Sequence, residues 1–189
     1  MRRFIARCVL AAFRYKTVGE RPKAPVYVMV AAPHTSNWDF VLMIAIAWKH
    51  GISPLWLGKK EMFSGPLGGL FKKLGGISVD RENPGDTAGD LARLAKSGKA
   101  SAIVIPPEGT RDKAEYWKSG FRRIAIDAGV PLVLSFVDGP TRTGGFGPEF
   151  MPTADVRADM DRIRAFYAGK EGVHPGQFTT PRLREEDAE

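Results

Sequence analysis

The sequence predicts a single α/β domain with a mixed, mostly parallel sheet, helices on both faces and an N-terminal amphipathic helix. Residues 25–32, 100–105 and 130–137 are apolar almost throughout, which is typical of strands buried on both faces. Amphipathic helical patterns alternate with these runs, as they do in α/β proteins. The 189 residues are 43% hydrophobic and 26% charged, ordinary values for a chain long enough to bury a core.

Glycine, proline and helix-capping residues divide the chain into elements. A polar connector over 16–24 follows the first helix, and the expected strands are 25–32, 52–57, 76–79, 100–105 and 130–137. The expected later helices are 38–50, a short one within 65–75, 86–97, 118–128 and 153–168. We expect residues 139–152 to form a loop. No repeat or linker interrupts the pattern, so we expect one domain over residues 1–189.

The two ends of the chain differ from this pattern. In residues 1–15, Arg3, Arg7 and Arg14 fall on one helical face and apolar side chains cover the opposite face. Such a helix either lies in the interface of an anionic membrane or packs on the core of its own domain. The charged tail, residues 169–189, is expected to be loosely held.

Composition restricts the partners and excludes some classes of site. The net charge of +7 and pI of about 9.7 indicate an anionic partner, whether nucleic acid, a membrane surface or a phosphate-bearing substrate. A single cysteine, Cys8, excludes an intramolecular disulfide and is typical of a reducing compartment. Three widely spaced histidines form no usual metal-ligand pattern. No apolar run reaches the roughly 18 residues of a membrane-spanning helix.

The segment Pro33–Asp39 carries the first candidate site. His34 directly follows a predicted strand, and residues 35–37 are capping residues that place Asp39 in the first turn of the next helix. The Asp39 carboxylate can then accept a hydrogen bond from one ring nitrogen of His34, leaving the other nitrogen as a general base. Such a pair suits a reaction whose nucleophile is a substrate hydroxyl. Alternatively, Asp39 only caps the helix.

A phosphate site is predicted at the same edge of the sheet. Arg81 and Arg111 each follow a predicted strand, and guanidinium groups bind oxyanions in a bidentate manner. Gly109 permits a close approach of the backbone, and Thr110 adds an amide and a hydroxyl. Glu108 orients one of the arginines or holds a substrate hydroxyl. Each charged residue alone also has a structural interpretation, as a solvated or ion-paired side chain.

In this order, the motifs resemble those of the glycerol-phosphate / lysophosphatidic acid acyltransferase family. The resemblance covers about residues 30–135 and rests on four stretches: His34-x4-Asp39, Gly75-Gly76-x4-Arg81, Pro107-Glu108-Gly109-Thr110-Arg111 and Val130-Pro131. It implies that His34 is the general base and that Asp39 orients it. It also implies an acceptor site made of Arg81, Glu108, Gly109, Thr110 and Arg111. Val130-Pro131 would shape the acyl or core side of the pocket.

The resemblance further implies the reaction and its partners. A fatty acyl group would pass from acyl-coenzyme A or acyl carrier protein, as co-substrate, to a hydroxyl of a glycerol-phosphate or lysophospholipid acceptor. We expect no metal and no bound cofactor, and no nucleic-acid partner. The expected location is cytoplasmic, peripherally associated with the inner face of the membrane through the N-terminal helix.

Other functions remain open at this stage. The net charge and scattered lysines also fit a basic module that binds nucleic acid, although no aromatic-rich nucleic-acid motif is present. The same His–Asp pair could serve a thioesterase, but no Gly-x-Ser-x-Gly nucleophile motif occurs. A third alternative is a relative that binds anionic lipid without catalysis, which the intact His34 and Asp39 disfavour.

Overall fold

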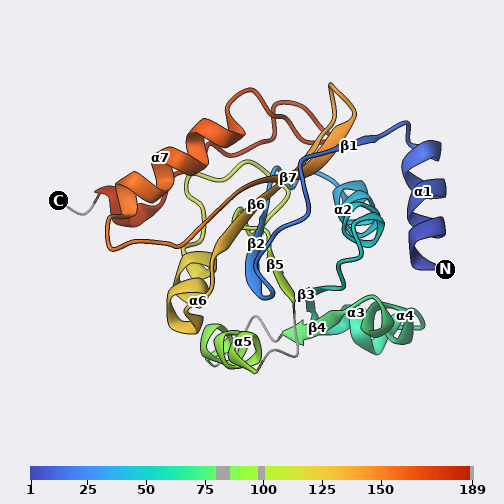
Figure 1. Ribbon diagram of the computed structural model, residues 1–189, viewed down its shortest axis with the longest axis horizontal. Coiled ribbons are helices and arrows are strands. Elements are labelled where there is room, and N and C mark those ends of the chain that lie inside the picture. The colour runs from blue at the N-terminus through green and yellow to red at the C-terminus, as the bar shows by residue number, and fades with distance from the viewer. Residues whose placement is uncertain (80–85, 98–100, 188–189) are drawn as a thin grey trace.

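The computed structural model describes residues 1–79, 86–97 and 101–187, whose strands form one mostly parallel sheet (Figure 1). Its strand order is β1-β7-β6-β2-β5-β3-β4. The strands are β1 (Lys16–Val18), β2 (Tyr27–Ala31), β3 (Pro54–Lys59), β4 (Gly76–Val79), β5 (Ala102–Ile105), β6 (Leu132–Asp138) and β7 (Thr143–Phe150). The five strands from β6 to β4 are parallel, and β7 pairs with β6 in the antiparallel direction.

Helices cover both faces of the sheet (Figure 1). On one face lie α1 (Arg2–Ala12), α2 (Asn37–Lys49), α3 (Lys60–Ser64) and α4 (Gly68–Lys73). On the other lie α5 (Thr87–Lys96), α6 (Gly120–Ala128) and α7 (Val156–Tyr167), and a short 3-10 helix (Arg184–Asp187) follows. This arrangement confirms the predicted fold class.

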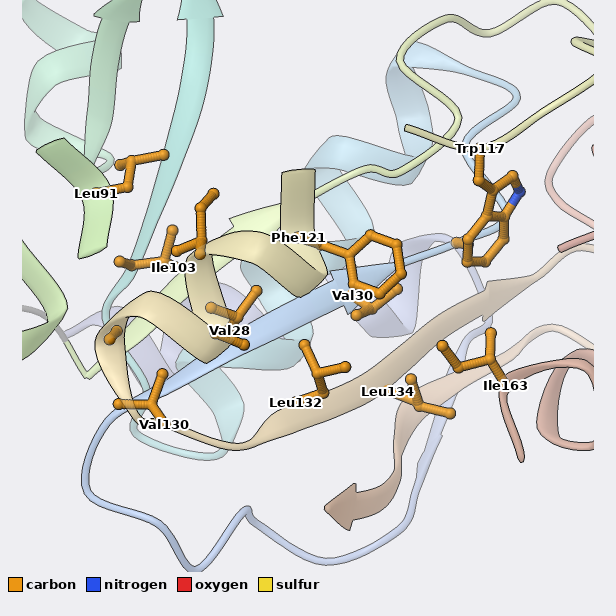
Figure 2. Packing of buried hydrophobic residues seen from close by; sticks show 14 of the residues in the cluster. Val28, Val30, Leu91, Ile103, Trp117, Phe121, Val130, Leu132, Leu134 and Ile163 are labelled. Atoms are coloured by element: carbon orange, nitrogen blue, oxygen red, sulfur yellow. The ribbon is translucent and has the colours of Figure 1, made fainter. Parts of the chain in front are cut away.

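The central strand β2 supplies side chains to both hydrophobic layers. Val28 and Val30 pack with the α5–α7 layer, whereas Tyr27 and Met29 face α1 and α2. All four are at most 2% exposed. This alternation follows from the two-residue period of a strand, and Figure 2 shows Val28 and Val30 beside Phe121.

The predicted loop over residues 139–152 is wrong, because this segment contains β7. No strand was predicted there because the segment is rich in glycine, which has a low strand propensity. The tertiary structure explains one of them, because a Cβ on Gly145 would lie 1.8 Å from the Val18 carbonyl oxygen of β1. The connector over 16–24 likewise contains a strand, β1, and the short helix α3 was not predicted.

The N-terminal helix packs on the domain and also keeps an exposed apolar surface. Ala6 and Leu10 are buried against α2, whereas Phe4 is 71% exposed and Ile5 42% exposed. The helix thus packs on the core of its own domain, and the membrane role of its exposed face stays a prediction. Within the described residues, no helix is long and apolar enough to cross a bilayer.

The C-terminal segment, which we expected to be loosely held, instead packs against the core. Leu183 is 1% exposed, and the backbone of Trp117 pairs with this part of the segment. The Trp117 indole also donates a hydrogen bond of 3.0 Å to the Thr179 carbonyl. Leu183 and Thr179 anchor this segment, and the charged composition of the tail gave no indication of their burial.

Replacing Leu183 with alanine should lower the free energy of unfolding by about 2–5 kcal/mol, because a buried leucine is exchanged for a cavity. Leu67→Ala is the matched control, since Leu67 is 56% exposed and its truncation should cost less than about 0.5 kcal/mol. Urea unfolding followed by circular dichroism measures both changes. Equal, small effects would contradict the docking of the C-terminal segment.

Candidate active site

A cavity of about 680 Å³ lies where the parallel strands β2, β5 and β3 end, and five predicted site residues line it: His34, Asp39, Gly109, Thr110 and Arg111. Parallel strands place their carboxyl ends at one edge of a sheet, which is where α/β proteins bind ligands. The polar residues that line the cavity include His34, Asn37, Asp39, Lys59, Thr110 and Arg111. Its apolar lining includes Phe40, Met43, Trp56, Leu70, Phe71 and Phe146.

His34 and Asp39 lie close together, but their side chains are not within hydrogen-bond distance. His34 Nδ1 is 3.8 Å from Asp39 Oδ2, so the predicted hydrogen bond is replaced by a longer contact. Asp39 Oδ1 is buried and accepts no hydrogen bond from the described residues.

Asp39 caps the helix, as the alternative interpretation of this residue predicted, and its role toward His34 stays a prediction. Its Oδ2 accepts the backbone N–H of Thr35 at 2.5 Å and that of Ser36 at 2.6 Å. Ser36 in turn accepts the Trp38 amide, which completes a capping box at the start of α2. Burial raises the pKa of Asp39, and the Ser36 and Thr35 amides oppose that rise. These hydrogen bonds favour the carboxylate form.

His34 is held in its neutral form. Burial, and to a smaller extent the positive charge of Arg111, lowers the pKa of His34 to about 4. Both causes disfavour the imidazolium, because it is poorly solvated and repelled by the guanidinium. At neutral pH the ring can therefore accept a proton. Since Nδ1 faces Asp39, Nε2 is the nitrogen left for a substrate.

Glu108 differs from its predicted role as a substrate ligand. The residue is 1% exposed and is not among the described residues that line the cavity. Its carboxylate oxygens accept the His34 amide at 2.7 Å and the Thr179 amide at 3.3 Å. Burial raises the pKa of Glu108 to about 7, against the effect of these amides. The geometry thus gives Glu108 a part in holding the backbone of the loop.

The rest of the Gly109–Arg111 stretch does lie at the cavity. Gly109 has a φ of +69°, a left-handed conformation that favours glycine. Thr110 accepts the Asp112 amide at 3.3 Å, and the Arg111 side chain is exposed at the rim. Predicted site residue Arg81 lies outside the described residues.

Lys59 and Asn37 are among the polar lining residues that were not predicted as site residues. Lys59 is the last residue of β3, and Asn37 is the first residue of α2. Lys59 could have been predicted from its position just after a predicted strand, the criterion that selected Arg81 and Arg111. Val130 packs in the α5–α7 core and Pro131 precedes β6, so this pair serves the core and not the cavity lining.

The structure contains no metal cluster within the described residues. No group of three or more histidine, cysteine, aspartate or glutamate side chains there has the arrangement needed to hold an ion. The cavity lining itself offers an imidazole, that of His34, and two cationic side chains, those of Arg111 and Lys59.

A family model and a relative of known name match this chain. Residues 16–134 match the family model described as Acyltransferase. The 1-acyl-sn-glycerol-3-phosphate acyltransferase of Bacillus subtilis (strain 168) is 33% identical over 119 residues, which cover 60% of this chain. The aligned part spans 56% of that relative.

A solved structure has a similar fold. The 1-acyl-sn-glycerophosphate (LPA) acyltransferase PlsC from Thermotoga maritima superposes with a TM-score of 0.62, over 87% of this chain and 77% of its own. The sequence identity is 17%, so this likeness concerns the fold.

Replacing Arg111 with alanine should raise the pKa of His34 from about 4 toward its ordinary value near 6.5. The sign follows because removing a positive charge makes the imidazolium less unfavourable. NMR titration of the histidine ring measures the change. Arg162→Ala, on the α7 helix, should leave the titration unchanged. An unshifted His34 in Arg111→Ala would show that the guanidinium does not act on the ring.

Proposed function

Because the chain belongs to the acyltransferase family, we propose that it moves a fatty acyl group from a thioester donor to a substrate hydroxyl. The proposed donor is acyl-coenzyme A or acyl carrier protein, and the acceptor is a glycerol phosphate or lysophospholipid. The observation that carries the proposal is a neutral His34 at a largely apolar cavity whose rim holds Arg111 and Lys59. An acyl chain, a reacting hydroxyl and an acceptor phosphate each have a chemically suitable partner there.

In the proposed reaction, His34 Nε2 removes the proton from the acceptor hydroxyl as that oxygen attacks the thioester carbonyl. The carbon–sulfur bond then breaks, the thiolate takes the proton from the imidazolium, and His34 returns to its neutral form. Asp39 stabilises the imidazolium through Nδ1. No covalent intermediate with the protein is required, because the nucleophile belongs to the acceptor.

The acceptor phosphate is proposed to bind Arg111 and Lys59, with Gly109 and Thr110 supplying close backbone and hydroxyl contacts. Arg81 is proposed as a further ligand from its sequence position. Phosphate binding also affects the base, because an anion on Arg111 offsets the charge that lowers the pKa of His34. Binding of the acceptor would therefore make His34 a stronger base when the hydroxyl is in place.

The oxyanion of the transition state needs donors other than the first amides of the loop. The His34, Thr35 and Ser36 amides already donate to Glu108 and Asp39. The Asn37 side chain lines the same cavity and carries an amide N–H₂ group. We propose Asn37 as a donor to the oxyanion.

The proposed membrane surface lies on the side of α1 and α2. Phe4 is 71% and Trp38 51% exposed, and the Trp38 ring lies 5.0 Å from that of Phe13 at the end of α1. Exposed Leu67 and Leu70 belong to the α4 region beside the cavity. Apolar side chains with nearby arginines are typical of peripheral binding to an anionic leaflet. The acceptor lipid would then reach the cavity from the membrane.

The reaction is tested by thiol release from acyl-coenzyme A, with and without a panel of glycerol-phosphate and lysophospholipid acceptors. His34→Gln should lower kcat by about 10²–10⁴-fold, the usual contribution of a general base. His50→Gln, at the other end of α2, is the control and should keep its activity. Release without acceptor would indicate a thioesterase, and full activity of His34→Gln would overturn the mechanism.

Phe4→Ser and Trp38→Ser should each weaken binding to phosphatidylglycerol vesicles by about tenfold or more, since a large apolar side chain contributes about 1.5–3 kcal/mol on burial. Ile126→Ser is the matched control, because Ile126 is 47% exposed on α6, which covers the other face of the sheet. Vesicle co-sedimentation measures all three. Equal binding of Phe4→Ser, Trp38→Ser and the control would exclude the α1–α2 side as the membrane surface.

A further inference from the structure

We name residues 171–183 the return segment. It connects α7 with the 3-10 helix near the C-terminus (Figure 1). It lies outside residues 16–134, the part of the chain that matches the family model. No site residue was predicted in this segment from the sequence. It nevertheless touches the loop that carries His34 at two separate points.

The first contact is with Thr35, the neighbour of His34. The His174 amide donates a hydrogen bond of 3.0 Å to Thr35 Oγ1. The backbone of Gly172 packs so closely on Thr35 that an added Cβ would lie 2.2 Å from the same oxygen. Thr35 is 3% exposed, so the return segment forms the wall behind it.

The second contact passes through Glu108. One carboxylate oxygen accepts the His34 amide and the other accepts the Thr179 amide, so a single buried side chain joins the two backbones. Because the Glu108 side chain is buried, losing either donor would leave a buried carboxyl oxygen without a hydrogen bond. The position of His34 is therefore coupled to that of Thr179.

Thr179 is itself fixed by its remaining polar groups. Its hydroxyl accepts the Ala114 amide at 2.9 Å, and its carbonyl accepts the Trp117 indole at 3.0 Å. Both partners come from the stretch that follows the Gly109–Arg111 rim. Thr179 thus connects the rim of the cavity, the return segment and Glu108.

We infer that the return segment positions the general base: Thr179, through Glu108, and Gly172–His174, through Thr35, hold the His34 loop in its working geometry. This inference rests on the proposed function. Glu108 and Thr179 are accordingly positioning residues that do not touch substrate. Reaction rates depend steeply on such geometry, and a misplacement of about 1 Å can cost 10²-fold.

Glu108→Gln and Thr179→Val test the inference. The glutamine keeps one acceptor oxygen but turns an N–H₂ donor toward one of the two amides. The valine keeps the shape of threonine and removes the acceptor of the Ala114 amide. Thr179→Ser restores the hydroxyl, and Thr180→Val is the matched control at the exposed neighbouring position.

We expect Glu108→Gln and Thr179→Val to lower kcat by about 10-fold or more, with donor and acceptor KM within about twofold of wild type. Thr179→Ser should recover most of kcat, and Thr180→Val should match wild type. A rise in acceptor KM at unchanged kcat in Glu108→Gln would overturn the inference, because it would make Glu108 a substrate ligand. Folded Thr179→Val with wild-type kcat would also overturn it.

A second measurement does not use the reaction. NMR titration should show the pKa of His34 rising from about 4 toward its ordinary value in both variants, as a loosened loop admits water around the ring. A wild-type titration in folded Glu108→Gln and Thr179→Val would overturn the inference. If the pKa moves but wild-type protein transfers no acyl group, the proposed function fails and the coupling stands. If Thr179→Val does not fold, Glu108→Gln decides alone.

Discussion

The candidate site depends on the burial of β2 on both faces and its pairing with β5 on one side and β6 on the other. Because β2 is surrounded in this way, the loop that follows it and carries His34 lies at the carboxyl edge of the sheet. The loops after β5 and β3 end at the same edge because these strands are parallel to β2. His34, Arg111 and Lys59 meet there although long stretches of chain separate them.

Two buried carboxylates then determine the conformation of the His34 loop. A carboxylate removed from water must be hydrogen-bonded, and backbone amides are the donors within reach. Asp39 takes the amides of Thr35 and Ser36, and Glu108 takes that of His34. Successive amides of one short loop are therefore bound by acidic side chains. The interactions that compensate for burying these carboxylates also fix the imidazole beside Asp39.

Much of the fold and part of the site could be predicted from sequence. Apolar runs and capping residues located β2, α2, β5 and α6 to within a few residues. His34 and Arg111 were expected at the same edge of the sheet, and both lie at the cavity there. The strand β7 was missed because its glycines are poor strand formers, and they are tolerated where β1 approaches Gly145 closely.

The sequence by itself determined the alternation of strands and helices, since the periodicity of apolar residues is a local property. It also determined the cap of α2, because Asp39 is only three to four residues from its donors. Only the tertiary structure decided the role of Glu108, whose two amide donors lie 74 and 71 residues away in the chain. It likewise decided that Thr179 belongs to the surroundings of His34. The partners of a buried charge depend on which distant backbones the packed sheet brings to it, and no local pattern records that.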